Sequence, residues 1–227
     1  MQIPLPFPQR EAGAEGTIPF YQGSANAPAL GFLEQWAGNL TADPATLGVI
    51  ITGASGAGKT RLAQEFGASL QALGYIGSEL GTLLQSPLTG PAYIIDDCER
   101  CAPSDLMGLI NHCLAQGYAF ILTGTGAPGK WAGDLVDLQT RLSALPQILL
   151  DLPDEDLLAK ALKAFLARRQ VQVRDGAIAD LLHYMRRDFN TAEQLAELVD
   201  KKLLSSPGSI SRSFVQGIFS AHPELNS

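Results

Sequence analysis

The sequence predicts an α/β domain built on a parallel sheet, followed by a small helical domain. Short apolar runs alternate with amphipathic segments up to about residue 152, and after Pro153 the helical period continues alone. Strands that alternate with helices form parallel sheets whose two faces are covered. We therefore expect an extended tail at residues 1–14, the α/β domain at 15–152 and the helical domain at 153–227.

Five segments are candidates for the strands of this sheet. Four are short apolar runs, and the fifth, near residues 75–80, has the weakest pattern. In chain order they are Leu47–Thr52, Tyr75–Leu80, Ala92–Ile95, Ala119–Thr123 and Gln147–Leu152. Between the strands, Thr60–Leu73 and Leu106–Gln116 show the apolar spacing of amphipathic helices.

The helical domain is expected to contain four helices. The first follows Pro153, where three consecutive acidic residues favour a helix N-terminus through the helix dipole. The second carries its apolar residues between positions 178 and 185. Asn190 and Glu193 predict the start of the third as a variant of the capping box. A short last helix is expected over Ile210–Phe219.

The composition is that of an acidic, folded chain. The chain has 227 residues, 46% of them hydrophobic and 17% charged, and a net charge of −7. Proteins that grip a nucleic-acid backbone usually carry the opposite sign. No segment has the pattern of a membrane span or a signal peptide, so we expect a cytoplasmic protein. The cysteines at 98, 101 and 113 are expected to be buried thiols.

The strongest chemical signal is the segment GASGAGKT, which lies between a predicted strand and a predicted helix. It fits the phosphate-binding pattern G-x-x-x-x-G-K-[ST] in the structural context that the pattern requires. Lys59 would reach the β- and γ-phosphates and Thr60 would bind Mg²⁺, so ADP or ATP with Mg²⁺ are the expected cofactors. The residues whose backbone would surround the phosphates are Gly53, Ala54, Ser55, Gly56, Ala57 and Gly58.

Further candidate residues follow the later strands. Asp96 and Asp97 end an apolar strand, so Asp96 would complete the Mg²⁺ site and Asp97 would orient a water molecule. Asp97 is shorter than the glutamate of many ATPases, and we expect slow intrinsic hydrolysis. Thr125 follows the next strand and would sense the γ-phosphate. Arg141 and Arg187 suit contact with a phosphate, although each taken alone is more typical of a solvated surface arginine.

Together these segments resemble the AAA+ ATPases and, among them, the DnaA family of bacterial replication initiators, over residues 17–219. The resemblance implies a P-loop domain with a five-stranded parallel sheet and a helical lid. Asp137–Leu142 is similar to the arginine-finger box of the family, which gives Arg141 a catalytic role in trans. Arg186–Ala192 resembles its sensor 2 region and gives Arg187 a role in nucleotide binding.

The beginning of the chain resembles a different element. Gln2, Leu5 and Phe7 match the peptide Q-x-x-L-x-[FL] that docks on the bacterial sliding clamp, the β subunit of the polymerase. We expect no counterpart of the helix-turn-helix domain of the initiators and no direct sequence-specific DNA binding. The resemblance implies a negative regulator that sits on DNA-loaded clamp and promotes hydrolysis of the ATP held by DnaA, with self-association possible.

Other functions stay open at this point. A small-molecule P-loop kinase would use arginines of the helical domain as a substrate lid. A module without catalysis would keep a nucleotide for folding and tether a partner to the clamp, and a truncated initiator would bind DNA directly. Only 37 positions separate Lys59 from Asp96, so an element between them is expected to be shorter than in the DnaA family.

Overall fold

The computed structural model describes residues 19–40, 46–205 and 208–226. Its contacts divide these residues into two units, which we describe separately. The α/β unit comprises residues 27–40, 46–54 and 58–151, and the helical unit comprises residues 19–26, 55–57, 152–205 and 208–226. The expected tail lies outside the described residues.

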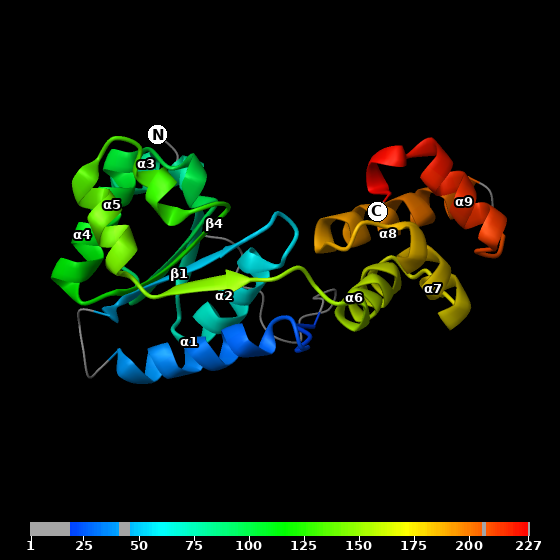
Figure 1. Ribbon diagram of the computed structural model, residues 1–227, viewed down its shortest axis with the longest axis horizontal. Coiled ribbons are helices and arrows are strands. Elements are labelled where there is room, and N and C mark those ends of the chain that lie inside the picture. Colours follow the sequence, from blue (N-terminus) through cyan, green and yellow to red (C-terminus); the bar gives the residue numbers. More distant parts are fainter. Residues whose placement is uncertain (1–18, 41–45, 206–207, 227) are drawn as a thin grey trace. The chain divides into compact units, whose positions relative to one another are not determined.

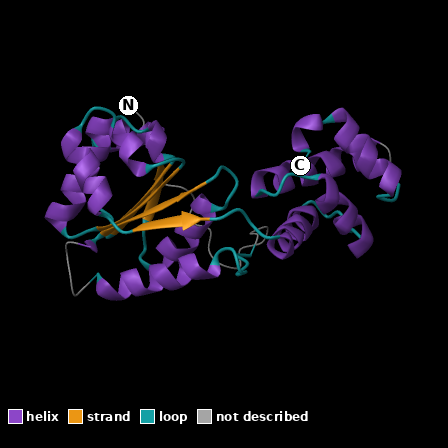
Figure 2. Cartoon of the chain, in the orientation of Figure 1, coloured by secondary structure: helices purple, strands orange, loops and turns teal. Residues whose placement is uncertain are grey.

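The α/β unit is built on a five-stranded parallel sheet, as predicted (Figure 2). The strand order is β2-β3-β4-β1-β5. β1, β3 and β4 are buried along their whole length, which is why each reads as a continuous apolar run. The strands are β1 (Gly48–Gly53), β2 (Leu73–Ile76), β3 (Ala92–Asp96), β4 (Ala119–Gly124) and β5 (Gln147–Leu150).

Helices cover both faces of this sheet (Figure 1). α1 (Ala27–Asn39) and α2 (Lys59–Ser69) lie on one face. α3 (Leu80–Leu83), α4 (Pro103–Gln116) and α5 (Val136–Ala144) lie on the other. The core between the sheet and the second group contains fully buried Tyr93, Phe120 and Leu106. Because all five strands run in one direction, their carboxyl ends meet at a single edge of the sheet.

Several elements differ from the sequence predictions. The first predicted helix stops at Ser69, and the second strand begins at Leu73 instead of Tyr75. The one-turn helix α3 is the only α-helix between β2 and β3 in the described chain, which explains the short spacing from Lys59 to Asp96. Helix α1 was not predicted, although its buried residues, Ala29, Leu33 and Trp36, have helical spacing.

The helical unit contains the four predicted helices, with the third capped differently. They are α6 (Glu155–Arg168), α7 (Asp175–Tyr184), α8 (Phe189–Ser205) and α9 (Arg212–Ala221). The amide of Thr191 donates to the carboxylate of Asp188 at 2.8 Å, so Asp188 caps α8. The predicted capping box at Asn190 is wrong, because the carboxylate of Glu193 instead pairs with Arg168 at 2.6 Å.

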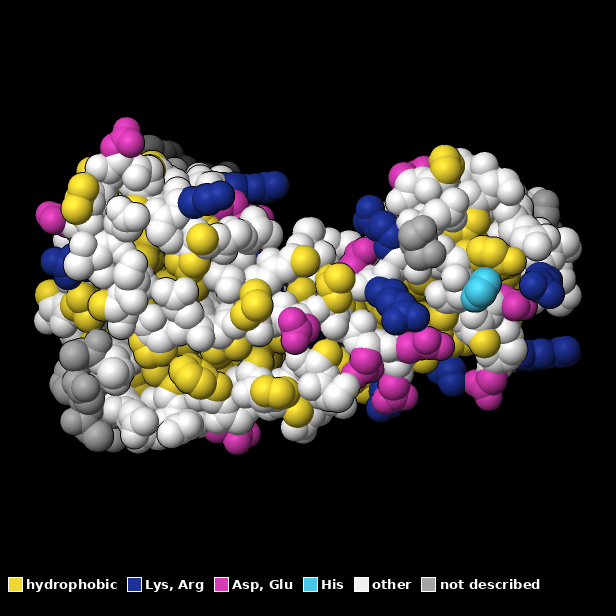
Figure 3. Space-filling model, in the orientation of Figure 1, with side chains coloured by type: hydrophobic (Ala, Val, Ile, Leu, Met, Phe, Trp, Pro, Cys, Tyr) yellow, Lys and Arg dark blue, Asp and Glu magenta, His cyan; other side chains and the backbone are white. Residues whose placement is uncertain are grey.

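Charge is distributed unevenly between the two units. Ten of the sixteen Lys and Arg residues lie in positions 152–227, and basic groups are frequent on the helical unit in Figure 3. Positions 27–151 contain eleven acidic and five basic residues, so the α/β unit carries most of the net negative charge. None of the described helices is both long and apolar enough to cross a membrane.

The three cysteines are buried free thiols, as expected. Burial raises the pKa of Cys113 to about 12, and it also raises the pKa of Cys98 well above its ordinary value. Thiols with such a high pKa stay protonated at neutral pH and react slowly. Among the described residues, no group of three or more His, Cys, Asp or Glu side chains could hold a metal ion by itself.

Candidate functional site

The segment between β1 and α2 has the backbone of a phosphate-binding loop. Gly56 and Gly58 have φ angles of 75° and 97°, in the left-handed region that favours glycine. A Cβ atom at Gly56 would also lie 2.7 Å from the Cβ of Asp188. Helix α2 begins at Lys59, directly after the loop, so its free amides and the positive end of its dipole are available to an anion.

Lys59 is folded back onto this loop. Its ammonium donates to the carbonyl oxygens of Gly53 at 3.0 Å and Ala54 at 2.9 Å. Burial lowers its pKa, whereas the negative charges of Glu99, then Asp96 and Asp97, act in the opposite direction. Two neutral carbonyls are weak partners for a buried cation, so a phosphate anion would be a better partner for the Lys59 ammonium.

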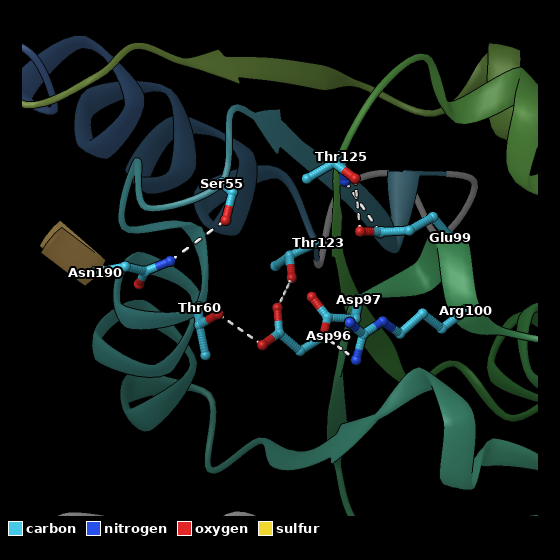
Figure 4. A network of polar contacts seen from close by, with 9 residues as sticks. All are labelled: Ser55, Thr60, Asp96, Asp97, Glu99, Arg100, Thr123, Thr125 and Asn190. Atoms are coloured by element: carbon cyan, nitrogen blue, oxygen red, sulfur yellow. Dashed lines mark hydrogen bonds and ion pairs between the residues drawn. The ribbon is translucent and has the colours of Figure 1, made fainter. Parts of the chain in front are cut away.

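Asp96 stands at the end of β3 and is held by two hydroxyl groups (Figure 4). Thr60 at the start of α2 donates to its Oδ2 at 2.6 Å, and Thr123 at the end of β4 donates to its Oδ1. The fold thus brings together the two predicted Mg²⁺ ligands, Thr60 and Asp96. A hydroxyl and a carboxylate are hard oxygen donors, and Mg²⁺ is commonly held by one carboxylate together with phosphate oxygens and water. This pair of residues fits that cation.

Asp97 follows in a left-handed conformation, with φ 53° and ψ 49°. Its carboxylate lies 3.6 Å from the guanidinium of Arg100. Burial, and then the charges of Asp96 and Glu99, raise its pKa. A carboxylate whose pKa is raised is a better proton acceptor than an ordinary one, which suits the predicted role of Asp97 toward water. In this structure the carboxylate of Asp97 is paired with the guanidinium of Arg100.

No pattern in the sequence indicated Glu99, whose carboxylate contacts the predicted sensor residue Thr125. Its carboxylate accepts hydrogen bonds from the hydroxyl of Thr125 at 2.6 Å and from the amide of Thr125 at 3.0 Å (Figure 4). Burial acts to raise the pKa of Glu99, but these two donors and the charge of Lys59 lower it overall. The indole of Trp131 donates to the carbonyl of Thr125. Thr123, rather than Thr125, therefore contacts Asp96.

The tip of the loop, residues 55–57, belongs to the helical unit by its contacts. The amide of Phe189, at the start of α8, donates to the carbonyl of Gly56 at 2.9 Å. The side-chain amide of Asn190 donates to the hydroxyl of Ser55 at 3.3 Å. The region that was predicted to act as a sensor thus contacts the loop through a backbone amide and a neutral side chain.

The two arginines before α8 have different surroundings. Arg186 lies 3.4 Å from the carboxylate of Asp188 and donates to the hydroxyl of Thr191 at 3.2 Å. The side chain of Arg187 is 69% exposed, and its guanidinium is 3.6 Å from the carboxylate of Glu155. Arg186 is therefore part of the cap of α8, whereas Arg187 is available to a ligand.

Arg141 lies in the last turn of α5 and is exposed. Within the described residues it forms no hydrogen bond or ion pair with a side chain, so its guanidinium is free to contact another molecule. Gln2, Leu5 and Phe7, the predicted clamp-binding residues, lie outside the described residues.

Comparison with solved structures gives close matches in fold at low sequence identity. Domain III of the Thermotoga maritima replication initiation protein DnaA matches with a TM-score of 0.73 and 16% identity, over 96% of this chain and 99% of that one. A replication initiator DnaA bound to AMPPCP and single-stranded DNA matches at 0.60 and 18%, over 82% and 66%. The Thermotoga maritima RuvB branch migration motor matches at 0.62 and 20%, over 88% and 69%.

The extent of these matches defines what the chain shares with them. It spans 63% and 66% of two longer initiator chains, but almost all of the isolated domain III. No protein-family model matches the sequence, and no curated protein is similar to it. The five-stranded parallel sheet and the helical unit therefore have the fold of domain III of DnaA.

Proposed function

We propose that the chain binds ADP or ATP together with Mg²⁺ at the loop Gly53–Thr60. The observation that carries this proposal is the contact between Thr60 and Asp96, two residues 36 positions apart, beside a glycine loop at a helix N-terminus. A half-buried hydroxyl and a buried carboxylate at that place have the chemistry of a nucleotide-bound cation site. AMPPCP is bound by one of the initiators with this fold.

Each residue of the site has a defined task in this proposal. Lys59 leaves the carbonyls of Gly53 and Ala54 and binds the β- and γ-phosphate oxygens. Mg²⁺, when bound, neutralises phosphate charge, and Thr60 and Asp96 would hold it. Arg187, whose guanidinium is mostly exposed, contributes a positive charge to nucleotide binding. Asp97 accepts a hydrogen bond from the attacking water only after it separates from Arg100, so intrinsic hydrolysis is slow.

We further propose that the chain is an Hda-like negative regulator of DNA replication initiation, acting in the cytoplasm. In this proposal Gln2, Leu5 and Phe7 dock on the sliding clamp, and Arg141 enters the nucleotide site of DnaA and stimulates hydrolysis of its ATP. The free guanidinium of Arg141 supports the second step, since a finger must be unpaired before it meets a foreign phosphate. The acidic α/β unit favours recruitment to DNA by a protein instead of direct DNA binding.

One observation favours a second function, a nucleotide-bound tethering module without catalysis. Asp97 pairs with Arg100, and both oxygens of Asp96 accept hydrogen bonds from hydroxyl groups, so these two carboxylates near Lys59 already have partners among the described residues. In that case Arg141 has no task, and the chain serves to hold a partner on the clamp.

The clamp-dependent step is tested by the tail. With ATP-loaded DnaA and clamp loaded on DNA, wild-type protein should convert the bound ATP to ADP, and the double variant Gln2→Ala with Leu5→Ala should not. The variant should bind ADP like wild type, since the tail lies apart from the loop in sequence. Clamp affinity equal to wild type in the double variant would refute the docking proposal.

A further inference from the structure

Backbone hydrogen bonds hold both ends of the turn between α7 and α8 in place. At its start, the amide of Arg186 donates to the carbonyl of Leu225 at 2.9 Å, and Met185 forms an antiparallel bridge with Asn226. At its end, the amide of Phe189 donates to the carbonyl of Gly56. The turn thus connects the segment Pro223–Asn226 to the tip of the phosphate-binding loop, entirely within the helical unit.

Leu225, whose carbonyl accepts from Arg186 at the start of the turn, lies in the hydrophobic core of the helical unit. Leu225 is 2% exposed and Met185 is 1% exposed, and both belong to the core of the helical unit. The short 3-10 helix Pro223–Leu225 follows α9 and returns the chain to this core. A buried leucine holds its own backbone in place, so the carbonyl that accepts from Arg186 is fixed by packing.

The side chain of Arg187 has no comparable support. It is mostly exposed, and its contact with Glu155, at 3.6 Å between two exposed groups, contributes little to its position. Arg186 is different, because Asp188 and Thr191 bind its guanidinium. The backbone of the turn therefore sets the position of Arg187, and that backbone is held by Leu225.

We propose that the segment Pro223–Asn226 positions Arg187 and Gly56 for nucleotide binding, and that a change in this segment alters the affinity of the phosphate-binding loop. The inference rests on the proposed nucleotide binding. Leu225 and Asn226 are positioning residues, since they act on the nucleotide only through the turn.

A shortened chain that ends at His222 tests the proposal. Its affinity for ADP should fall by about fivefold, since one backbone hydrogen bond and the packing that orients it are lost. Arg187→Ala should cause a similar loss, and the two changes together should cost no more than either one, because they act on the same contact. Val215→Ala is the matched control, since it opens a cavity in the same core from α9.

Two outcomes separate positioning from general destabilisation. If Val215→Ala lowers the melting temperature as much as the shortening but leaves the ADP affinity within twofold, the segment has a positioning role. Equal affinity losses in the two variants at equal losses of melting temperature would overturn the proposal.

The intact chain provides a second readout, which does not depend on the folding of any variant. Hydrogen exchange of the peptides that cover residues 185–189 and 222–226 should slow together when ADP is added. Protection that is confined to the loop would contradict the proposal. If ADP binds to wild type with an affinity that Lys59→Ala leaves unchanged, the proposed nucleotide site fails and this inference fails with it.

Discussion

The polar groups at the ends of the central strands differ from the two exposed arginines in burial and in the partners that they have. Asp96 and Thr123 are buried, and the carboxylate oxygens of Asp96 are both hydrogen-bonded. Arg141 and Arg187 are exposed, and the nearest carboxylate in an ion pair with Arg187 is 3.6 Å away. Buried polar groups need partners to repay desolvation, whereas exposed cations do not. The buried groups therefore have partners within the chain, whereas the exposed arginines can contact a ligand without giving up a buried partner.

Removal of the loop cation should have the largest effect on nucleotide binding. Lys59→Ala eliminates a charged contact to the phosphates, so affinity for ADP and ATP should fall by about 10- to 100-fold. Titration calorimetry measures this loss. ADP should also raise the melting temperature of wild type and not that of the variant, because a bound ligand stabilises the folded state.

Lys130→Ala is the matched control for this change. Lys130 is an exposed cation of the same unit, outside the loop, and its removal should leave the affinity unchanged. If Lys59→Ala binds ADP as well as wild type does, the buried ammonium of Lys59 has no role in phosphate binding. The comparison between buried and exposed charged groups would then say nothing about the nucleotide site.

Arg187 should contribute less than Lys59, because an exposed side chain must be ordered before it binds. Arg187→Ala is expected to weaken ATP binding by about fivefold. Arg174→Ala, which removes another exposed arginine of the helical unit, should have no such effect. Equal affinities of the two variants, measured by titration with ATP, would place Arg187 outside the nucleotide site.

Loss of the contact between Glu99 and Thr125 should have the smallest effect. We expect a small decrease in the free energy of unfolding, and the size of this decrease should depend on pH. The pKa of Glu99 is lower in the folded chain than its ordinary value, so its ionised form stabilises the fold above that ordinary value. This contribution is lost as the pH falls and the carboxylate is protonated. After screening by solvent we expect less than about 1 kcal/mol.

Urea denaturation at pH 7 and pH 4 measures this difference. Glu99→Gln should be less stable than wild type at pH 7, and the gap should narrow at pH 4. The exposed Glu79 supplies the control Glu79→Gln, which removes a carboxylate outside the contact with Thr125. A gap that widens as the pH falls would contradict the assigned sign.

Local pattern was sufficient for the parts of the fold that are buried in regular elements. Continuous apolar runs predicted the sheet, and a glycine motif between a strand and a helix predicted the loop. Helix α1 was missed because Pro28, Gly31 and Gly38 weaken its helical propensity, and its stability comes from the burial of Leu33 and Trp36.

Contacts between residues that are distant in the sequence and belong to no motif could not be predicted. Glu99 and Thr125 are 26 positions apart, and no local pattern marks a carboxylate that will accept from a particular hydroxyl. The same holds for Arg186 and Leu225, which meet through backbone atoms. Asp188 caps α8 instead of Asn190 because its carboxylate reaches both the amide and the hydroxyl of Thr191.

The central claim is that an exposed arginine of this chain acts on a nucleotide held by another protein. The measurement is the conversion of DnaA-bound ATP to ADP in the presence of DNA-loaded clamp, with wild type, Arg141→Ala and the control Lys130→Ala. Wild type and Lys130→Ala should accelerate hydrolysis, and Arg141→Ala should not, although it binds ADP and clamp normally. Full acceleration by Arg141→Ala would contradict the claim, and so would the absence of acceleration by wild type.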